Sequence, residues 1–421
     1  MMRRRGERRA PETPSIQVGS GAAADLAARR PGQRALDPRL RTALVLVGVA
    51  AVVFAVGLVM PTNLFNESMH TYGDHDGYTL AWFIRDLSSN VEGLFALLTG
   101  DVEAAGRTLS RVITYAVIIV CGAGLALCGA VYQGTFRNAL VSPSTLGVMS
   151  GASLGMALWV LFLYDPAESH GLWFEAQGAQ AADPLQSLWN SYGLSLCSFV
   201  GCVIVVGLVV LAIGTVGKGS ASGLMMIIMG QIIGAVMGGI TSTIRYYFVT
   251  VDPEGAQAEM MMELQIASFY RSYTLIDLVA VGVPVLLMFA VVMRYRSQLT
   301  LLAFSEAEAR AMGVETRRMR FLIIGLATLV TAIIVSFCGR VGFVGFIIPH
   351  LARRLVGPSF TYLMPVSMAA GGAFVLAAYV LTLMFLGDSY ATMSGMFISI
   401  GGAVVFLVTA VRGVGGKRGA F

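Results

Sequence analysis

The side chains best suited to bind a metal ion lie in two polar segments, residues 61–111 and 165–193. Imidazole and carboxylate groups, which are common metal ligands, gather there at His70, Asp74, His75 and Asp76, and at Asp165, Glu168, His170, Glu175 and Asp183. Their spacing follows no helical period that would fix ligand geometry, and short acidic segments with histidine are usually solvated. We therefore predict solvated loops, and no metal or cofactor bound by this chain.

The rest of the chain does not combine a nucleophile, a base and a metal site, so nothing indicates an enzyme. The phosphate-binding pattern G-x-x-x-x-G-K-[ST] is also absent from the sequence, which predicts no ATPase site of its own. The long apolar stretches are essentially free of acids, and Gln133 and Gln231 are the most polar groups in their interior. Ion-coupled secondary transporters usually carry Asp, Glu or His inside their spans. A secondary transporter is therefore the less favoured alternative.

Composition places these stretches in a membrane. Of the 421 residues, 56% are hydrophobic and 13% are charged, and the mean hydropathy is +0.74. A soluble globular protein does not have this composition. The cysteines lie in or beside apolar runs without the C-x-x-C spacing of a zinc site, so we interpret them as core residues: Cys121, Cys128, Cys197, Cys202 and Cys338.

A helix needs about 20 apolar residues to cross roughly 30 Å of hydrocarbon. Apolar windows that fit this length lie near 42–60, 112–135, 145–164, 194–214, 221–245, 274–294, 319–338, 362–386 and 393–411. The Gly-rich stretch 341–355 is shorter. Hydropathy alone therefore leaves nine or ten spans.

The distribution of positive charge favours ten spans, because Lys and Arg accumulate on the cytoplasmic side of a membrane. With ten spans and the N-terminus inside, 23 of the 29 basic residues face inward. The outer ones are Arg85, Arg107, Arg111, Arg245, Arg271 and Arg340. The sequence thus predicts an all-α polytopic integral membrane protein with about ten transmembrane helices and both termini cytoplasmic.

Residues 1–41 precede the first span and carry ten arginines against four acids, without hydrophobic periodicity. This composition predicts a disordered basic tail in the cytoplasm. The tail sets the topology, and it can also lie on anionic lipid headgroups. Residues 42–415 form the predicted membrane domain.

Residues 129–155 join the end of one apolar helix to the start of the next through a polar turn. Asn138 and Pro143 belong to a turn that cannot continue a helix, so backbone groups are freed near the edge of the bilayer. Neighbouring protein groups or water must satisfy them, and Arg137 and Asn138 are suited to that task. The stretch is either a topological turn or a structural element beside a transport path.

The apolar stretch 221–245 carries Gly230, Gly234 and Gly238 at four-residue spacing, which leaves one helix face without side chains. Such a face lets another helix approach closely. Flexible and weakly polar side chains share the stretch and are suited to a path for a bulky substrate, among them Gln231, Met237, Thr241 and Ser242. Packing alone explains the glycines equally well, so both interpretations stay open.

A charged, helix-forming segment, residues 302–320, lies between two spans on the predicted inner side. Ser305 can cap a short helix, and Glu308, three residues later, can complete a capping box. Gly313 can end that helix and permit the turn into the next one. The sequence therefore predicts a rigid short helix outside the membrane.

Three motifs resemble those of the membrane permeases of ABC importers for iron siderophores, haem and cobalamin, the FecCD-type family. The pattern G-x-x-x-Q-x-x-x-R-N-P-L-x-x-P-x-x-L-G-x-x-x-G-A-x-x-G is similar at Gly129, Gln133, Arg137, Asn138, Leu140, Pro143, Leu146, Gly147, Gly151, Ala152 and Gly155. The pattern L-G-E-x-x-A-x-x-L-G-V is similar at Glu306, Ala309, Gly313 and Val314. Residues 339–353, with Pro349 and His350, resemble G-P-I-G-F-V-G-L-x-x-P-H-x-x-R. The resemblance covers roughly residues 42 to 415.

This resemblance implies a permease dimer that works with a cytoplasmic ABC ATPase and an external substrate-binding protein. It adds a tenth transmembrane helix at 341–355, and it favours a pathway role for 221–245, because the corresponding helix lines the central channel in these importers. The residues it implies for ATPase coupling are Glu306, Glu308, Ala309, Arg310 and Gly313. We interpret His350, alone near a helix end, as a structural hydrogen-bonding group and not a ligand or base.

Departures from the family pattern gather on the predicted outer face. The family's R-L-P-R reads Arg111-Val-Ile-Thr114, so Arg111 alone is left to bind the external protein. On the same face, Met393-Ser-Gly395 lacks the proline of L-P-I-G, and Arg340 replaces another proline. Ala139 also replaces a proline, but it lies in the inner turn beside Arg137, where we expect the change to loosen the turn without altering its role. The changes on the outer face leave room for a heterodimer in which a sister subunit supplies the missing charge.

We therefore predict a permease subunit in the cytoplasmic membrane of a prokaryote that imports an iron chelate. Fe(III)-siderophore is the first choice on family frequency, and haem and cobalamin stay open as cargo. The predicted partners are the ATPase, the binding protein, a second permease subunit and membrane lipid, without nucleic acid. ATP is used by the partner ATPase.

Overall fold

The computed structural model describes residues 38–59, 80–101, 106–139, 141–163, 184–216, 223–251, 255–266, 268–269, 273–302, 306–313, 315–386 and 393–415. Within these residues the regular elements are helices. They are α2 (Pro38–Val59), α4 (Leu80–Thr99), α5 (Gly106–Phe136), the 3-10 helix η1 (Pro143–Leu146), α6 (Val148–Phe162), α7 (Pro184–Val216), α8 (Gly223–Val251), α9 (Ala256–Ile266), α10 (Leu275–Arg294), α11 (Arg296–Leu301), α12 (Glu306–Ala311), α13 (Thr316–Cys338), α14 (Val344–Val356), α15 (Phe360–Leu386) and α16 (Ser394–Gly415).

Each of the ten predicted spans coincides with one helix: α2, α5, α6, α7, α8, α10, α13, α14, α15 and α16. Seven of these are long and apolar enough to cross a membrane, whereas α6 and the apolar part of α16 are shorter. Helix α14 has only 13 residues. The prediction of an all-α polytopic membrane protein is confirmed.

Two boundaries differ from the prediction. Helix α2 already begins at Pro38, inside the stretch assigned to the basic tail, because proline is well tolerated in the first turn of a helix. The outer segment 61–111 contains α4, whose apolar residues follow a helical period along one face although its mean hydropathy is low. The rest of the tail, the acidic and histidine residues considered above as metal ligands, and Ser305 lie outside the described residues.

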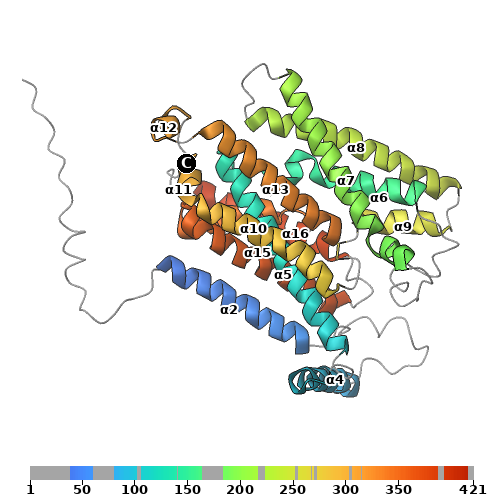
Figure 1. The fold of residues 1–421 in the computed structure, drawn as a ribbon. Coiled ribbons are helices and arrows are strands. Elements are labelled where there is room, and N and C mark those ends of the chain that lie inside the picture. The colour runs from blue at the N-terminus through green and yellow to red at the C-terminus, as the bar shows by residue number, and fades with distance from the viewer. Residues whose placement is uncertain are drawn as a thin grey trace, which may run out of the picture.

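Helix α5 is the centre of the bundle and packs against α10, α13, α14 and α15. Its middle is almost fully buried, including the aromatic side chains of Tyr115 and Tyr132. Around it, α2 and α15 close one side, and α6, α7 and α8 form a second group beside it (Figure 1). Figure 1 also shows α11 and α12 at one end of the bundle and α4 at the other.

Close backbone contact holds the central helices together. A β-carbon added at Gly122 of α5 would lie 2.5 Å from the carbonyl oxygen of Gly371 of α15, so the two backbones touch without side chains between them. In the second group, Gly151 and Gly155 of α6 meet Gly201 of α7 in the same way. Small residues at such crossings are how helices associate in a membrane, where lipid is as apolar as leucine.

We expect Gly371→Ala to destabilise the bundle, because the new methyl group would overlap the α5 backbone. Overpacking of this kind costs about 1–3 kcal/mol. The matched control is Gly282→Ala in α10, where an added β-carbon has nothing within 4 Å. Thermal unfolding in detergent should show a lower midpoint for Gly371→Ala alone. An equal shift in both variants would mean that the contact does not limit stability.

Candidate functional site

The turn after α5 is made by a residue in the left-handed backbone region. Arg137 has φ 51°, and the next amide, of Asn138, donates to the carbonyl oxygen of Gln133 at 3.2 Å. The amide of Val141 in turn donates to the carbonyl of Asn138 at 3.3 Å. The main chain of Asn138 therefore satisfies two freed backbone groups, the carbonyl of Gln133 and the amide of Val141. This contribution is separate from the role predicted for its side chain.

A short 3-10 helix, η1, connects this turn to α6. The Thr145 hydroxyl donates to the carbonyl oxygen of Ser142 at 2.6 Å and accepts from the Ser142 amide at 3.3 Å. Pro143 occupies the first turn and is buried. Gly147 then ends η1 with φ 78°, a conformation that favours glycine. The local sequence thus specifies both the break and the restart of the helix.

Two motifs that are far apart in the sequence meet at this turn. The Gln133 side chain, 1% exposed, donates from Nε2 to the carbonyl oxygen of Phe346 in α14 at 2.8 Å. Its Oε1 accepts from Nη1 of Arg353 at 3.4 Å. A β-carbon added at Gly345 would lie 2.9 Å from Cδ of Pro143, so α14 is seated directly on η1. We name Gln133, Pro143, Gly345, Phe346 and Arg353 the α5–α14 joint.

Helix α14 also carries the predicted structural pair Pro349 and His350. Pro349 is buried inside the helix, and His350 is half-buried beside it. Within the described part of the chain, no group of three or more His, Cys, Asp or Glu side chains is arranged to hold a metal ion. The structural role of His350 stays a prediction.

The glycines of α8 fall into two groups that the sequence did not separate. A β-carbon added at Gly230 would meet the backbone of Thr145, and one at Gly234 would lie 3.2 Å from Oγ of Ser150. These two glycines therefore pack on η1 and α6. At Gly238 an added β-carbon has nothing within 4 Å. The first half of α8 thus supports the packing interpretation, whereas the second half has open space.

The polar side chains of α8 lie on or near its open side. Gln231 and Ser242 are exposed, and Met237 and Thr241 are half-buried. Thr241 donates to the carbonyl oxygen of Met237 at 2.9 Å, so its hydroxyl is satisfied within the helix. The other helices of the bundle do not cover these side chains.

The predicted coupling helix is α12. Gly313 has φ 81° just after it and permits the turn that leads toward α13, as the sequence predicted. Ala309 is 1% exposed and anchors the helix, whereas Glu308 is exposed. Glu306 and Arg310 lie in the same helix, but their side chains are outside the described part. Helix α12 projects at one end of the bundle next to α13 (Figure 1).

Arg111 lies at the opposite end, in the first part of α5. It is half-buried, and its Nη1 donates to Oδ1 of Asn90 in α4 at 2.7 Å. Nδ2 of Asn90 donates to the carbonyl oxygen of Val59, the last residue of α2, at 3.3 Å. Arg111 thus ties α4 and α2 to α5, a task that sequence analysis missed because α4 was not predicted. Its docking role stays a prediction.

The altered motif before α16 is held by Ser268, a residue that sequence analysis did not identify. Oγ of Ser268 accepts from the amide of Gly395 at 2.6 Å and lies 3.3 Å from Oγ of Ser394. Ser268 also pairs with Gly339 in an isolated antiparallel bridge. These contacts join the ends of α13 and α16 at the predicted outer side, where the family's proline is missing.

A model of the FecCD transport family matches residues 77–412. The cobalamin import system permease protein BtuC of Halobacterium salinarum is 33% identical over 284 residues, which are 66% of this chain and 66% of BtuC. The molybdate import system permease protein MolB of Haemophilus influenzae is 30% identical over 64% of this chain and 69% of MolB.

Other matches have lower identity. The Fe(3+) dicitrate transport system permease protein FecC of Escherichia coli is 29% identical over 71% of this chain and 83% of FecC. A solved structure, described as an inward-facing conformation of a metal-chelate type ABC transporter, covers 89% of this chain and 99% of its own. Its TM-score is 0.65 and its identity is 24%, which supports a shared fold.

We expect Gln133→Leu to weaken the α5–α14 joint, because it leaves the Phe346 carbonyl and the Arg353 guanidinium without the amide. An unpaired buried group costs about 1–3 kcal/mol. A double-mutant cycle with Arg353→Ala, measured by thermal unfolding, should give non-additive losses. Additive losses would show that Gln133 and Arg353 do not interact energetically.

Proposed function

Since this chain belongs to the FecCD transport family, and is thus a permease of ABC importers, we propose that it carries an iron chelate across the cytoplasmic membrane, with Fe(III)-siderophore as the first choice. A separate polypeptide hydrolyses the ATP, because this sequence has no phosphate-binding loop. The chain itself is then a transport subunit and not an enzyme.

The observation that carries this proposal is the open face of α8. An exposed carboxamide such as that of Gln231 is costly against lipid, where nothing replaces its hydrogen bonds to water. Helix α8 contains no acidic residue, and Arg245 is its single basic residue. Exposed apolar side chains such as Ile232 and Val236 lie on the same helix. A mixed, almost uncharged wall of this kind suits a large chelate that must pass without being held tightly. The same face would meet a second permease subunit across the channel.

The two ends of the bundle suit the two remaining partners. Helix α12, with Glu308 exposed on it, is a small rigid projection on the predicted inner side, which fits contact with the ATPase. At the other end, α4 and Arg111 lie where an external binding protein would dock. Because Arg111 is already bonded to Asn90, we infer that its part in docking is to place α4.

Cobalamin is a second candidate cargo, and a specific observation favours it. The relative with 33% identity is a cobalamin permease, whereas the ferric dicitrate relative has 29% identity. A mixed, almost uncharged wall accommodates either molecule. Haem stays a third candidate within the same family.

The test is uptake by the permease reconstituted in proteoliposomes with its own ATPase and binding protein. We expect ATP-dependent uptake of an iron-loaded hydroxamate siderophore in preference to haem and cyanocobalamin. Uptake of cyanocobalamin alone would overturn the iron proposal. Uptake driven by a proton or sodium gradient without ATP would overturn the importer mechanism itself.

We expect leucine at Gly234 and at Gly238 to act differently. Gly238→Leu adds its side chain to open space, so the protein should fold normally while ATP-dependent uptake falls. Gly234→Leu overlaps Ser150 and should lower the unfolding midpoint, at a cost of about 1–3 kcal/mol. The control is Gly325→Leu in α13, where an added β-carbon also meets open space. Normal uptake by Gly238→Leu would contradict a pathway role for this face.

A further inference from the structure

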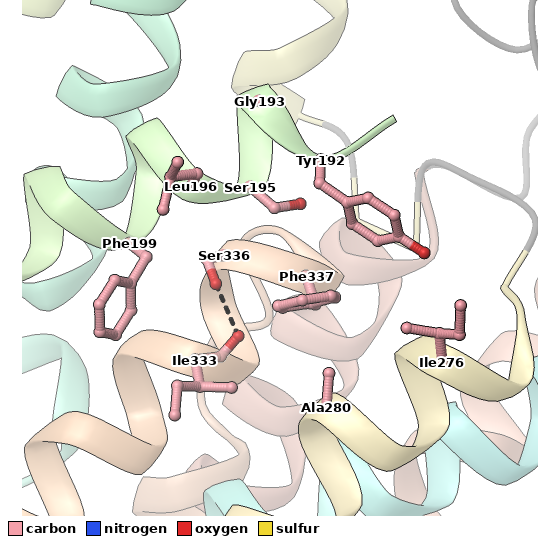
Figure 2. Close-up of a pocket in the computed structure, with 10 residues that line it drawn as sticks. All are labelled: Tyr192, Gly193, Ser195, Leu196, Phe199, Ile276, Ala280, Ile333, Ser336 and Phe337. Atoms are coloured by element: carbon pink, nitrogen blue, oxygen red, sulfur yellow. Dashed lines mark hydrogen bonds between the residues drawn. The ribbon is translucent and has the colours of Figure 1, made fainter. Parts of the chain in front are cut away.

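A groove lies between α7, α10 and α13, on a part of the surface that the transport proposal does not use. Its volume is about 600 Å³, within the roughly 300–1,000 Å³ typical of sites for small ligands. We name it the α7–α10–α13 groove and define it by residues from these three helices that line it (Figure 2): Tyr192, Ser195, Ile276, Ala280, Ser336 and Phe337.

The mouth of the groove opens on an apolar part of the surface. Its rim includes Leu196 and Ile276, whose side chains are 53% and 66% exposed. On α10 the exposed apolar side chains continue from Ile276 along the helix, through Val279, Val283, Leu286 and Leu287. The lining residues come from α7, α10 and α13, whereas the proposed transport path runs along α8. The groove is therefore open to lipid and separate from that path.

One hydroxyl in the groove has no partner. Ser195 is 2% exposed, and its Oγ makes no hydrogen bond in the described structure. Figure 2 shows this hydroxyl pointing into the space between Tyr192 and Phe337. The Ser336 hydroxyl differs, because it donates to the carbonyl oxygen of Ile333 at 2.8 Å. A buried hydroxyl without a partner costs stability, so an acceptor on a bound molecule would stabilise this site.

The depth of Ser195 limits what that acceptor can be. The apolar window of α7 predicted from the sequence begins near residue 194, so Tyr192 lies just before this window, and Ser195, about 4.5 Å further along the helix, lies at its start. Tyrosine is enriched at the membrane interface, with its ring at the level of the headgroups. The ester carbonyls of phospholipids lie at this boundary between headgroups and chains. On the predicted topology this is the outer leaflet.

We propose that the α7–α10–α13 groove binds one acyl chain of an outer-leaflet phospholipid, whose ester carbonyl accepts a hydrogen bond from Ser195. The chain enters between Leu196 and Ile276 and lies against Ala280 and Phe337. The ring of Tyr192 borders the groove, with its centroid 6.5 Å from that of Phe337. A metal chelate fits this site poorly, because the lining offers almost no polar group beyond the serines and the tyrosine hydroxyl.

The experiment uses the full chain in nanodiscs that contain a phosphatidylglycerol with a diazirine on its acyl chain. After illumination, we expect labelled peptides from the groove segments of α7 and α13. Ala280→Phe fills the groove and should lower labelling by about tenfold or more, because the chain loses its buried apolar contact. Val283→Phe, on the exposed face of α10 outside the groove, is the matched control and should leave labelling unchanged.

The hydrogen bond is tested separately with two lipids of the same chain length. Ser195→Ala should lower labelling by an ester-linked lipid roughly threefold to tenfold, as expected for one lost hydrogen bond. It should not change labelling by an ether-linked lipid, which lacks the carbonyl. Equal effects on both lipids would overturn the role of Ser195 as donor.

Two results would overturn the groove as a lipid site. One is uniform labelling along all exposed helices, which would mean that lipid contacts the groove only as it contacts any surface. The other is wild-type labelling that excess unlabelled phospholipid does not displace. If Ala280→Phe elutes as an aggregate on size exclusion, the displacement experiment on the wild type decides instead.

Discussion

The rest of this structure depends on glycines at helix crossings, where the lack of a side chain lets two backbones touch. In lipid, helices gain little from burying apolar surface against each other, so close packing must hold them. At the centre, Gly122 meets Gly371, and Gly129 meets the backbone of Gly345. These contacts bring α15 and α14 onto α5 closely enough for polar groups to pair across the interface. The Gln133 bond to Phe346 is possible only at that distance.

The same close packing allows the chain to leave the helical conformation inside the bundle without leaving backbone groups unsatisfied. Non-helical backbone in a membrane must be satisfied by protein or water. Between α5 and α6 the main chain satisfies itself through Asn138, Ser142 and Thr145, while α14 covers the turn. The joint therefore fixes the direction of α6, and through Gly230 and Gly234 it fixes the first half of α8. The open half of α8 begins where this support ends.

The bundle thus has faces with different tasks. The α8 face combines exposed polar side chains such as Gln231 and Ser242 with exposed apolar ones such as Ile232 and Val236. It also has open space beside Gly238, which suits passage of a large molecule or contact with a second subunit. The α7 and α10 face is apolar, as a surface against lipid should be, apart from the buried Ser195 hydroxyl. Separate faces allow a bound lipid to support the outer ends of α7, α10 and α13 without obstructing transport.

The sequence alone determined the helices and the motifs, because both depend on residues close together in the chain. The nine apolar windows and the shorter stretch 341–355 all became helices, and the turn residues Arg137, Pro143 and Gly147 act locally. Helix α4 was not predicted, because its apolar residues occupy one face only and its mean hydropathy is therefore low. The partner of Arg111, Asn90 of α4, was hidden for the same reason.

Only the tertiary structure decided which glycines pack and which stay open. Gly234 and Gly238 lie four residues apart on α8. They differ because α6 lies beside Gly234 and not beside Gly238. The pairing of Gln133 with Phe346 likewise joins residues 213 positions apart. Such contacts depend on how whole helices pack against one another, and the local sequence does not specify this packing.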